Sequence, residues 1–186
     1  MLPRSFYRRD ASVVARDLLG KILVCNIGGG TSGVIVETEA YYGANDPASK
    51  VYGMKHRNHP MYGECGKVFV YVVHANWLLN IITGRVGEGG AVLIRALEPL
   101  EGIELMMRRR GVSKLEELTN GPGKLTQAMG IDGRVQGEDV TLSRKLYITR
   151  GKKERFLISR SHRIGVRRDL KRKLRFFIKG NKFVSR

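Results

Sequence analysis

Residues 34–42 place two carboxylates inside a segment that otherwise has the composition of a buried strand, and this feature restricts the fold more than any other. The segment reads Val-Ile-Val-Glu-Thr-Glu-Ala-Tyr-Tyr. Because strand side chains alternate between two faces, one face is expected to hold Ile35, Glu37, Glu39 and Tyr41. A buried carboxylate without a partner is costly, so the glutamates are expected either to pair with cations of the chain or to serve in acid–base chemistry. Taken alone, the nine residues favour structural ion pairs.

The net charge narrows the classes of partner. The chain carries 34 Lys or Arg against 17 Asp or Glu, a formal net charge of +17 over 186 residues. A field of this size favours polyanions, nucleic acid first and an anionic membrane surface second. No run approaches the roughly 20 apolar residues of a membrane-spanning helix, and the first ten residues lack the apolar core of a signal peptide. We expect no membrane association and one domain over residues 1–186.

The cysteines and histidines give no sign of a metal site. Cys25 and Cys65 lack Cys-x-x-Cys spacing, and the four histidines lack metal-ligand spacing. Two cysteines are too few for a disulfide framework, so a reducing compartment is expected. The expected location is the cytoplasm of a prokaryote, at the nucleoid, or the nucleus of a eukaryote.

Hydrophobic periodicity and turn residues predict an α+β domain with a mostly antiparallel sheet. Asp10 is expected to cap a helix over residues 11–19, and Pro99 to begin a helix that ends at Arg110. Two more helices are predicted, over residues 114–118 and before Gly130. Strands are predicted at residues 21–26, 31–40, 67–73, 77–83, 91–97, 146–149, 156–159 and 174–178. Residues 43–66 show no period and form a long loop, which in a compact domain is usually functional.

Positive charge is concentrated in residues 150–186. This last fifth of the chain holds fifteen Lys or Arg against Glu154 and Asp169, a net +13. Apolar residues such as Phe156 and Phe176 are interspersed with the basic ones, so the segment can pack while displaying a basic face. That combination favours a nucleic-acid footprint over a solvated tail.

Residues outside the acidic strand could complete a site, although each has a structural alternative. Arg95 interrupts the apolar strand at residues 91–97 and needs an acidic partner, for which Glu39 and Glu37 are the obvious choices. The rings of Tyr41 and Tyr71 could hold an extruded base.

Two turns could contact DNA. His74, at the tip of the hairpin formed by the strands at 67–73 and 77–83, could wedge between bases. Residues 120–124, Asn-Gly-Pro-Gly-Lys, precede a helix and could bind a phosphate. They lack the ending of a nucleotide-triphosphate loop, so a triphosphate site is not expected.

Six segments occur in the order of one known family. They are Val36-Glu-Thr-Glu-Ala-Tyr41, Arg57-Asn58, Val70-Tyr71, Leu93-Ile-Arg-Ala-Leu-Glu-Pro-Leu-Glu-Gly102, Gly121-Pro-Gly-Lys-Leu125 with Gln127-Ala128, and Arg163-Ile-Gly-Val166. Over nearly its whole length the chain resembles the alkyladenine (3-methyladenine) DNA glycosylases. The resemblance implies a single mixed domain with a curved, mostly antiparallel sheet, surrounding helices and a protruding hairpin that inserts into DNA.

The resemblance also implies an activity. A monofunctional glycosylase of base excision repair flips a damaged purine, alkylated or deaminated, out of duplex DNA and hydrolyses its N-glycosidic bond, leaving an abasic site. Glu39 matches the general base that activates the attacking water, and Arg95 a residue that helps hold that water. No metal or organic cofactor is implied. The expected partner is double-stranded DNA containing damaged purines, and the expected state is a monomer.

The implied binding residues fall into two groups. In the base pocket, Tyr41 and Tyr71 match rings that sandwich the base, Asn80 a residue that disfavours the exocyclic amine of guanine, and Ile164 an apolar residue at the water site. The residues expected at the DNA backbone are Arg57, Asn58, Gly121, Gly123, Lys124 and Arg163.

Two positions depart from the family pattern. Lys50 stands where the family usually has a base-stacking histidine, and its charge should repel a cationic alkylated purine. The hairpin between Tyr71 and Asn80 is one residue shorter than usual, and His74 or Asn76 replaces the intercalating tyrosine.

Three alternatives stay open. Lys50 could attack the sugar as an amine and cleave the strand. A non-catalytic basic nucleic-acid-binding protein would explain the charge but leave Glu39, Arg95 and Tyr41 without a role. A sugar hydrolase would explain paired carboxylates but not the charge.

Overall fold

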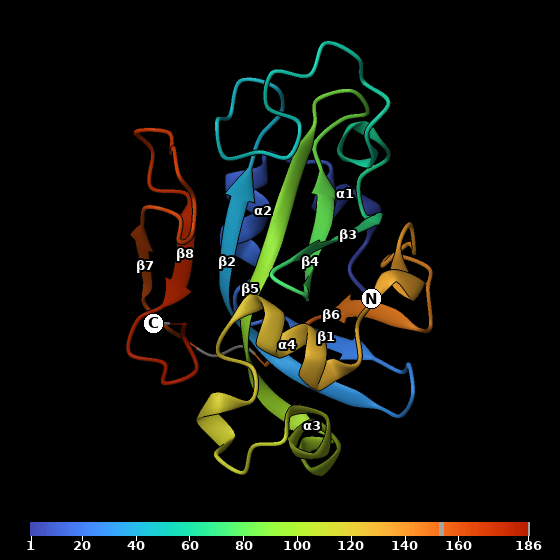
Figure 1. Ribbon diagram of the computed structural model, residues 1–186, viewed down its shortest axis with the longest axis vertical. Helices are drawn as coiled ribbons and strands as arrows, with labels where there is room; N and C mark the ends of the chain where they lie inside the picture. Colours follow the sequence, from blue (N-terminus) through green and yellow to red (C-terminus); the bar gives the residue numbers. More distant parts are fainter. Residues whose placement is uncertain (153–154, 186) are drawn as a thin grey trace.

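Strand β2 (Thr31–Tyr41), which contains both glutamates, is the centre of the sheet. In the computed structural model, which describes residues 1–152 and 155–185, β2 pairs along one edge with β5 (Gly90–Glu101). Its other edge is shared by β1 (Ile22–Cys25) and β8 (Arg175–Ile178). The strand order is β3-β4-β5-β2-β1-β6, with β8 and then β7 branching from β2, and every pairing is antiparallel (Figure 1). The remaining strands are β3 (Val68–Val73), β4 (Asn76–Thr83), β6 (Leu146–Thr149) and β7 (Ile158–Ser161).

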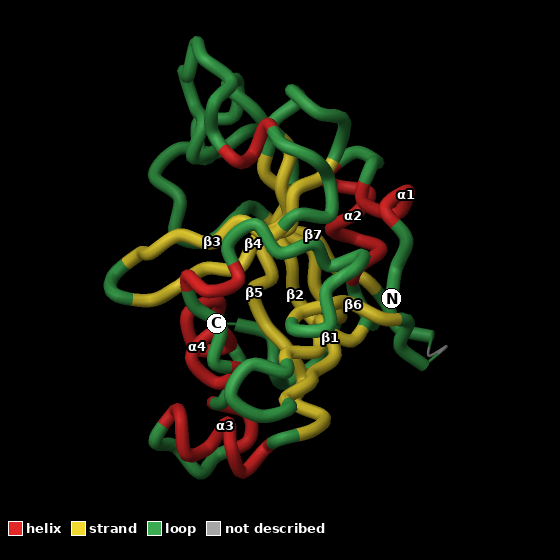
Figure 2. Tube along the Cα trace, turned by 90° about the vertical axis from the view of Figure 1, so that its right-hand side faces the viewer, coloured by secondary structure: helices red, strands yellow, loops and turns green. Residues whose placement is uncertain are grey.

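Helices cover one face of the curled sheet, which confirms the α+β class with a mostly antiparallel sheet. They are α1 (Arg4–Tyr7), α2 (Ala11–Leu18), α3 (Ile103–Arg110) and α4 (Pro122–Met129), with short 3-10 turns η1 (Pro60–Tyr62), η2 (Leu115–Glu117) and η3 (Gly133–Val135). Leu18 of α2 and Leu125 of α4 lie in one fully buried core with Val92 and Ile94 of β5. Figure 2 shows α3 at the lower end of the molecule and α4 beside the lower half of the strands.

Several predicted boundaries are confirmed, and one helix start is wrong. Asp10 caps α2 by accepting the Ser12 N–H at 2.8 Å. Pro99 does not begin a helix, because β5 continues to Glu101 and α3 begins only after Gly102, whose φ is 71°. At that end β5 pairs with β2 alone, so the missing N–H of Pro99 is tolerated on a free edge. The strand predicted at 156–159 is also displaced, to β7.

A register irregularity changes which side chains share a face of β2. The pairing with β5 shifts on both sides of Glu37. As a result, Ile35 lies in the core with Ala40, whereas Tyr41 lies in a separate cluster on the opposite face with Leu93. The prediction that Ile35 shares the face of Tyr41 is therefore wrong, since an irregularity breaks the alternation of period two.

Two excursions flank the face that carries Tyr41. Residues 43–66 form the predicted long loop, whose only helical turn is η1, above the ends of β2 and β5 (Figure 1). The hairpin of β3 and β4 projects sideways in Figure 2 and turns at His74 and Ala75, with φ of 47° and 62°. Asn76 packs on α4, since a Cβ on Gly123 would lie 2.7 Å from its Cβ. Insertion of the hairpin into DNA stays a prediction.

Of the helices that the structure describes, none combines the length and apolar character needed to cross a bilayer. Three residues of the basic segment 150–186, namely 153, 154 and 186, lie outside the described residues.

Candidate functional site

Glu39 is fully buried and accepts three hydrogen bonds from described residues. Its Oε1 accepts the backbone N–H of Ile164 at 2.8 Å. Its Oε2 accepts the hydroxyl of Tyr41 at 2.8 Å and Nη1 of Arg95 at 3.3 Å. An ionised carboxylate has about four acceptor positions, so these donors leave room for one more at Oε1. The side chain is thus fixed in orientation and still able to accept a proton.

The electrostatic surroundings of Glu39 suit a proton acceptor. Burial raises its pKa above the ordinary value of a glutamate, and nearby Glu37 raises it further. Arg95, the Ile164 N–H and the Tyr41 hydroxyl offset this only in part. A carboxylate with a raised pKa is a stronger base near neutral pH than an exposed one.

A cavity of about 610 Å³ lies on the sheet face in front of Glu39. Five of the predicted site residues line it together: Tyr41, Lys50, Tyr71, Arg95 and Ile164. Glu39 stands directly behind this wall, bonded to three of its members. A cavity of this size is typical of small-molecule sites.

The two tyrosines differ in their surroundings. The hydroxyl of Tyr41 is bonded to Glu39, and its ring lies 4.5 Å from Cζ of Arg163. Tyr71 is half-buried, and burial together with Glu39 raises its pKa to about 12. The ammonium of Lys50 lies 4.4 Å from the centre of the Tyr71 ring. Lys50 therefore occupies space over a ring that was predicted to stack on a base.

Glu37, in contrast, is held as a structural ion. Its carboxylate accepts Nε of Arg175 at 2.6 Å and Nε of Arg95 at 3.1 Å. Ser185 adds two more bonds, from its backbone N–H at 2.7 Å and its hydroxyl at 2.8 Å. Both arginines and the Ser185 hydroxyl donate to Oε1, and the Ser185 N–H donates to Oε2, so Glu37 is bonded to two guanidinium groups and the two glutamates of β2 have different surroundings.

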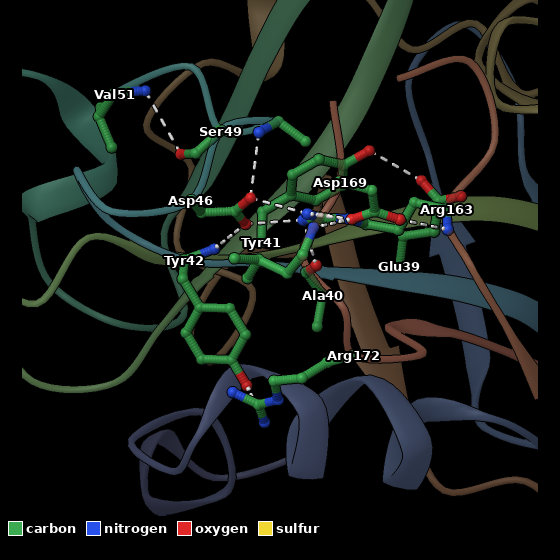
Figure 3. A network of polar contacts seen from close by, with 12 residues as sticks. Glu39, Ala40, Tyr41, Tyr42, Asp46, Ser49, Val51, Arg163, Asp169 and Arg172 are labelled. Atoms are coloured by element: carbon green, nitrogen blue, oxygen red, sulfur yellow. Dashed lines mark hydrogen bonds and ion pairs between the residues drawn. The ribbon is translucent and has the colours of Figure 1, made fainter. Parts of the chain in front are cut away.

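Arg163 is not available for the predicted contact with the DNA backbone. Its side chain is fully buried between Asp46 and Asp169, with contacts of 2.7 Å to each (Figure 3). It also donates to the carbonyl of Ala40 at 2.9 Å. Burial alone would lower the pKa of Arg163, but the two aspartates raise it above its ordinary value. The guanidinium instead links the backbone next to Ile164 to Ala40 of β2 and to Asp46 in the loop after Tyr41.

Other predicted residues lie away from the cavity wall. Asn80 is buried, donates to the carbonyl of Leu78 at 3.4 Å and does not line the cavity, whereas Leu78 does. Arg57 lines a different cavity, beside Tyr42 and Glu88. Lys124 and Gly121 line a third, which they share with Arg95. Asn58, His74 and Asn76 are exposed, as contact with DNA would require.

Sequence reasoning missed several residues of the site. The cavity is also lined by Tyr52, which is 53% exposed, and by Val166, Arg167 and Arg168. An aromatic residue in a long loop that was expected to be functional was an available signal for Tyr52. No sequence pattern near these residues indicated that Asp46 pairs with Arg163 or that Ser185 binds Glu37. Among the described residues, no group of His, Cys, Asp or Glu is arranged to hold a metal ion.

Comparison with known proteins identifies the family. The pattern of methylpurine-DNA glycosylase (MPG) matches residues 5–182. A relative from Carboxydothermus hydrogenoformans is 43% identical over 100% of this chain and 99% of its own length. Relatives from Clostridium perfringens (strain SM101) and Bacillus licheniformis are each 44% identical over 100% of this chain, and 98% and 96% of their own lengths. All three carry the provisional name 3-methyladenine DNA glycosylase. The resemblance seen in the motifs is thereby confirmed, and the chain belongs to the methylpurine-DNA glycosylase family, whose members hydrolyse N-glycosyl bonds.

Proposed function

We propose that this protein is a DNA-repair glycosylase that removes 3-methyladenine and related damaged purines, including deaminated ones, by hydrolysis with a Glu39-activated water. The observation that carries the proposal is the placement of one ionisable carboxylate directly behind a cavity lined by two tyrosines. The net charge of +17 supplies the attraction for duplex DNA. We expect the protein to act as a monomer, in the compartment that holds the chromosome.

The mechanism follows from the groups around the cavity. The flipped purine displaces the Lys50 ammonium from the Tyr71 ring and lies between Tyr41 and Tyr71, and a water approaches the free acceptor position of Glu39. As the water oxygen bonds to the sugar C1′, Glu39 takes a water proton and the electrons of the C1′–N bond leave with the base. Arg95, bonded to Glu39, helps hold the water.

The direct test uses a duplex that contains a single lesion. The protein is incubated with the duplex, which is then treated with hot alkali and sized on a gel. A glycosylase leaves an abasic site that alkali cleaves, whereas a basic binding protein or a sugar hydrolase leaves the strand intact. An intact strand with 3-methyladenine, 7-methylguanine and hypoxanthine substrates would overturn the proposal.

Base release should fall as the pH is lowered through the pKa of Glu39. Only the ionised carboxylate accepts a proton, so the rate should drop by about tenfold per pH unit below that pKa. Because burial raises the pKa of Glu39, the acid limb of the pH–rate profile, where the rate falls, should lie at higher pH than it would for an exposed glutamate. Single-turnover rates with saturating protein between about pH 4 and about pH 8 measure it. A rate that stays flat down to the ordinary range of glutamate would contradict this role.

Lys50 should shift the lesion preference towards neutral purines such as hypoxanthine. Its ammonium lies over the Tyr71 ring, so a cationic purine entering the cavity would face a like charge. Lys50→Met removes the charge at similar length and should raise the rate ratio of 7-methylguanine to hypoxanthine by about tenfold. Arg57→Met is the matched control, because Arg57 lines another cavity. Equal single-turnover excision of the two lesions by the wild type would sink this idea.

The amine alternative for Lys50 is tested separately. Attack on the sugar by its amine would form an imine that borohydride traps covalently. Lys50 packs on the ring of Tyr71, whereas Glu39 and Arg95 are bonded to each other beside the cavity. This arrangement favours water as the nucleophile. We expect no trapped complex, and a trapped complex lost in Lys50→Met would establish the lyase.

A further inference from the structure

Ser185 is hydrogen-bonded to Glu37 and Arg95, the two charged residues next to Glu39 in the site. Its side chain and backbone are buried, with 7% of the residue exposed. The hydroxyl donates to Glu37 Oε1 at 2.8 Å, and the backbone N–H donates to Glu37 Oε2 at 2.7 Å. Its carbonyl accepts Nη2 of Arg175 at 3.1 Å. Phe183, packed with Val36 and Ala96, anchors the segment to the sheet.

The Ser185 hydroxyl oxygen also accepts a hydrogen bond from Arg95. Nη2 of Arg95 lies 3.4 Å from Ser185 Oγ, while Nε bonds Glu37 and Nη1 bonds Glu39. The guanidinium is a rigid plane, so three acceptors on three sides fix its orientation. Because the Ser185 hydroxyl gives its proton to Glu37, its lone pair is directed to Arg95.

We propose that Ser185 is a positioning residue for base release, which it supports by holding Arg95 against Glu39. The proposal rests on the proposed function of Glu39 as general base. Without the hydroxyl, Glu37 loses a donor and Arg95 loses an acceptor, so the guanidinium is drawn towards Glu37 and its contact with Glu39 weakens. The nucleophilic water then loses part of its support.

The surroundings of Glu39 predict how the change would be seen. The charged and titratable groups around it are Arg95 from β5, Glu37 and Tyr41 from β2, Tyr71 from β3 and, across the strand pairing, Arg175 from β8. Among them, Arg95 is the cation that lowers the pKa of Glu39. A displaced Arg95 would therefore raise that pKa further, and the acid limb of base release would move to higher pH.

A second cavity leaves space for a conservative substitution. Arg95 and Ser185 both line a cavity of about 700 Å³ beside η2 and the start of α4, and Ser185 does not line the cavity in front of Glu39. A threonine at this position can direct its extra methyl into that space while it keeps the hydroxyl. Ser185→Thr should thus retain the positioning contact that Ser185→Ala removes.

The test compares three variants with the wild-type protein. Ser185→Ala should release hypoxanthine about tenfold more slowly in single turnover at neutral pH, with the acid limb moved upward, and should bind duplex DNA normally. Ser185→Thr should restore both the rate and the limb. Ser32→Ala is the matched control, since Ser32 lies on β2 remote from Glu39, is 2% exposed, and donates its hydroxyl to Glu101 of β5 at 3.0 Å. It should change thermal stability without moving the pH profile.

The rates and pH profiles of these variants decide whether Ser185 positions Arg95. An unshifted limb and a wild-type rate in Ser185→Ala, or an equal loss in Ser32→Ala, would overturn the positioning role. Failure of threonine to restore the rate would do the same. No base release by the wild-type protein would instead overturn the proposed function, and the positioning role with it.

Discussion

Replacement of Glu39 with glutamine is expected to slow base release by a factor of about 10² to 10⁴, with little change in binding to lesion-containing duplex. The amide is close in size to the carboxylate but cannot take a proton from water. Glu39 stands behind the cavity wall, so the surfaces that Tyr41 and Tyr71 present to a base stay in place. Single-turnover excision measures the rate, and fluorescence anisotropy with lesion-containing duplex measures binding.

The substitution also has a structural cost that must be measured beside the rate. Both carboxylate oxygens of Glu39 accept hydrogen bonds, on one side from Ile164 and on the other from Tyr41 and Arg95. A glutamine amide nitrogen must face one of these donors, at a cost of about 1–3 kcal/mol. Thermal unfolding of the variant establishes that the rate is measured on folded protein.

Glu37→Gln is the matched control on the same strand. Glu37 is equally buried, but its donors are Arg95, Arg175 and Ser185. Its substitution should lower stability more than Glu39→Gln does, and lower the rate less. If Glu39→Gln retained more than about one-tenth of the wild-type rate, or if the two variants lost the same rate, Glu39 would not be the proton acceptor.

The parts of the fold that depend on local patterns could be predicted from the sequence. Asp10 caps α2, and alternation places β3 and β4 on either side of a short turn. Pro99 shows the limit of such signals, because the same residue suits a helix start and a free strand edge. Only the length of pairing between β2 and β5 decides between them.

The parts of the site formed by one strand or one motif could be predicted. The contacts between residues far apart in the sequence could not. The pairing of Arg95 with the glutamates of β2 follows from two adjacent strands, one of which buries two carboxylates and the other a guanidinium. The pairing of Arg163 with Asp46, 117 positions apart, has no local signal, since Asp46 lies in the loop at residues 43–66, which shows no period. Arg163 was consequently predicted at the DNA surface although it is buried.

Loss of the Asp46 carboxylate is expected to destabilise the folded protein by about 3–5 kcal/mol, because it leaves a buried arginine with one of its two acidic partners. Arg163 and Asp46 are both fully buried and form two contacts of 2.7 Å (Figure 3). Asp46 also accepts the backbone N–H groups of Tyr42 and Ala48, each at 3.0 Å. Asp46→Ala removes all of these bonds, and urea unfolding of the variant measures the loss.

Asp17→Ala is the control that separates a buried ion pair from an exposed one. Asp17 pairs with Arg9 and Arg16 while a third of its side chain is exposed, so its loss should cost about 1 kcal/mol or less. A comparable loss in the two variants would contradict the importance of burial.

Salt gives an independent criterion for the Asp46 prediction. Exposed pairs are screened, so the small effect of Asp17→Ala should shrink as salt is added, whereas the effect of Asp46→Ala should persist. Because Arg163 covers the ring of Tyr41 and precedes the Ile164 N–H that holds Glu39, base release by folded Asp46→Ala should fall as well. Loss of stability with an unchanged rate would mean that the buried aspartate supports the fold alone, and that Glu39 keeps its orientation without the braced loop.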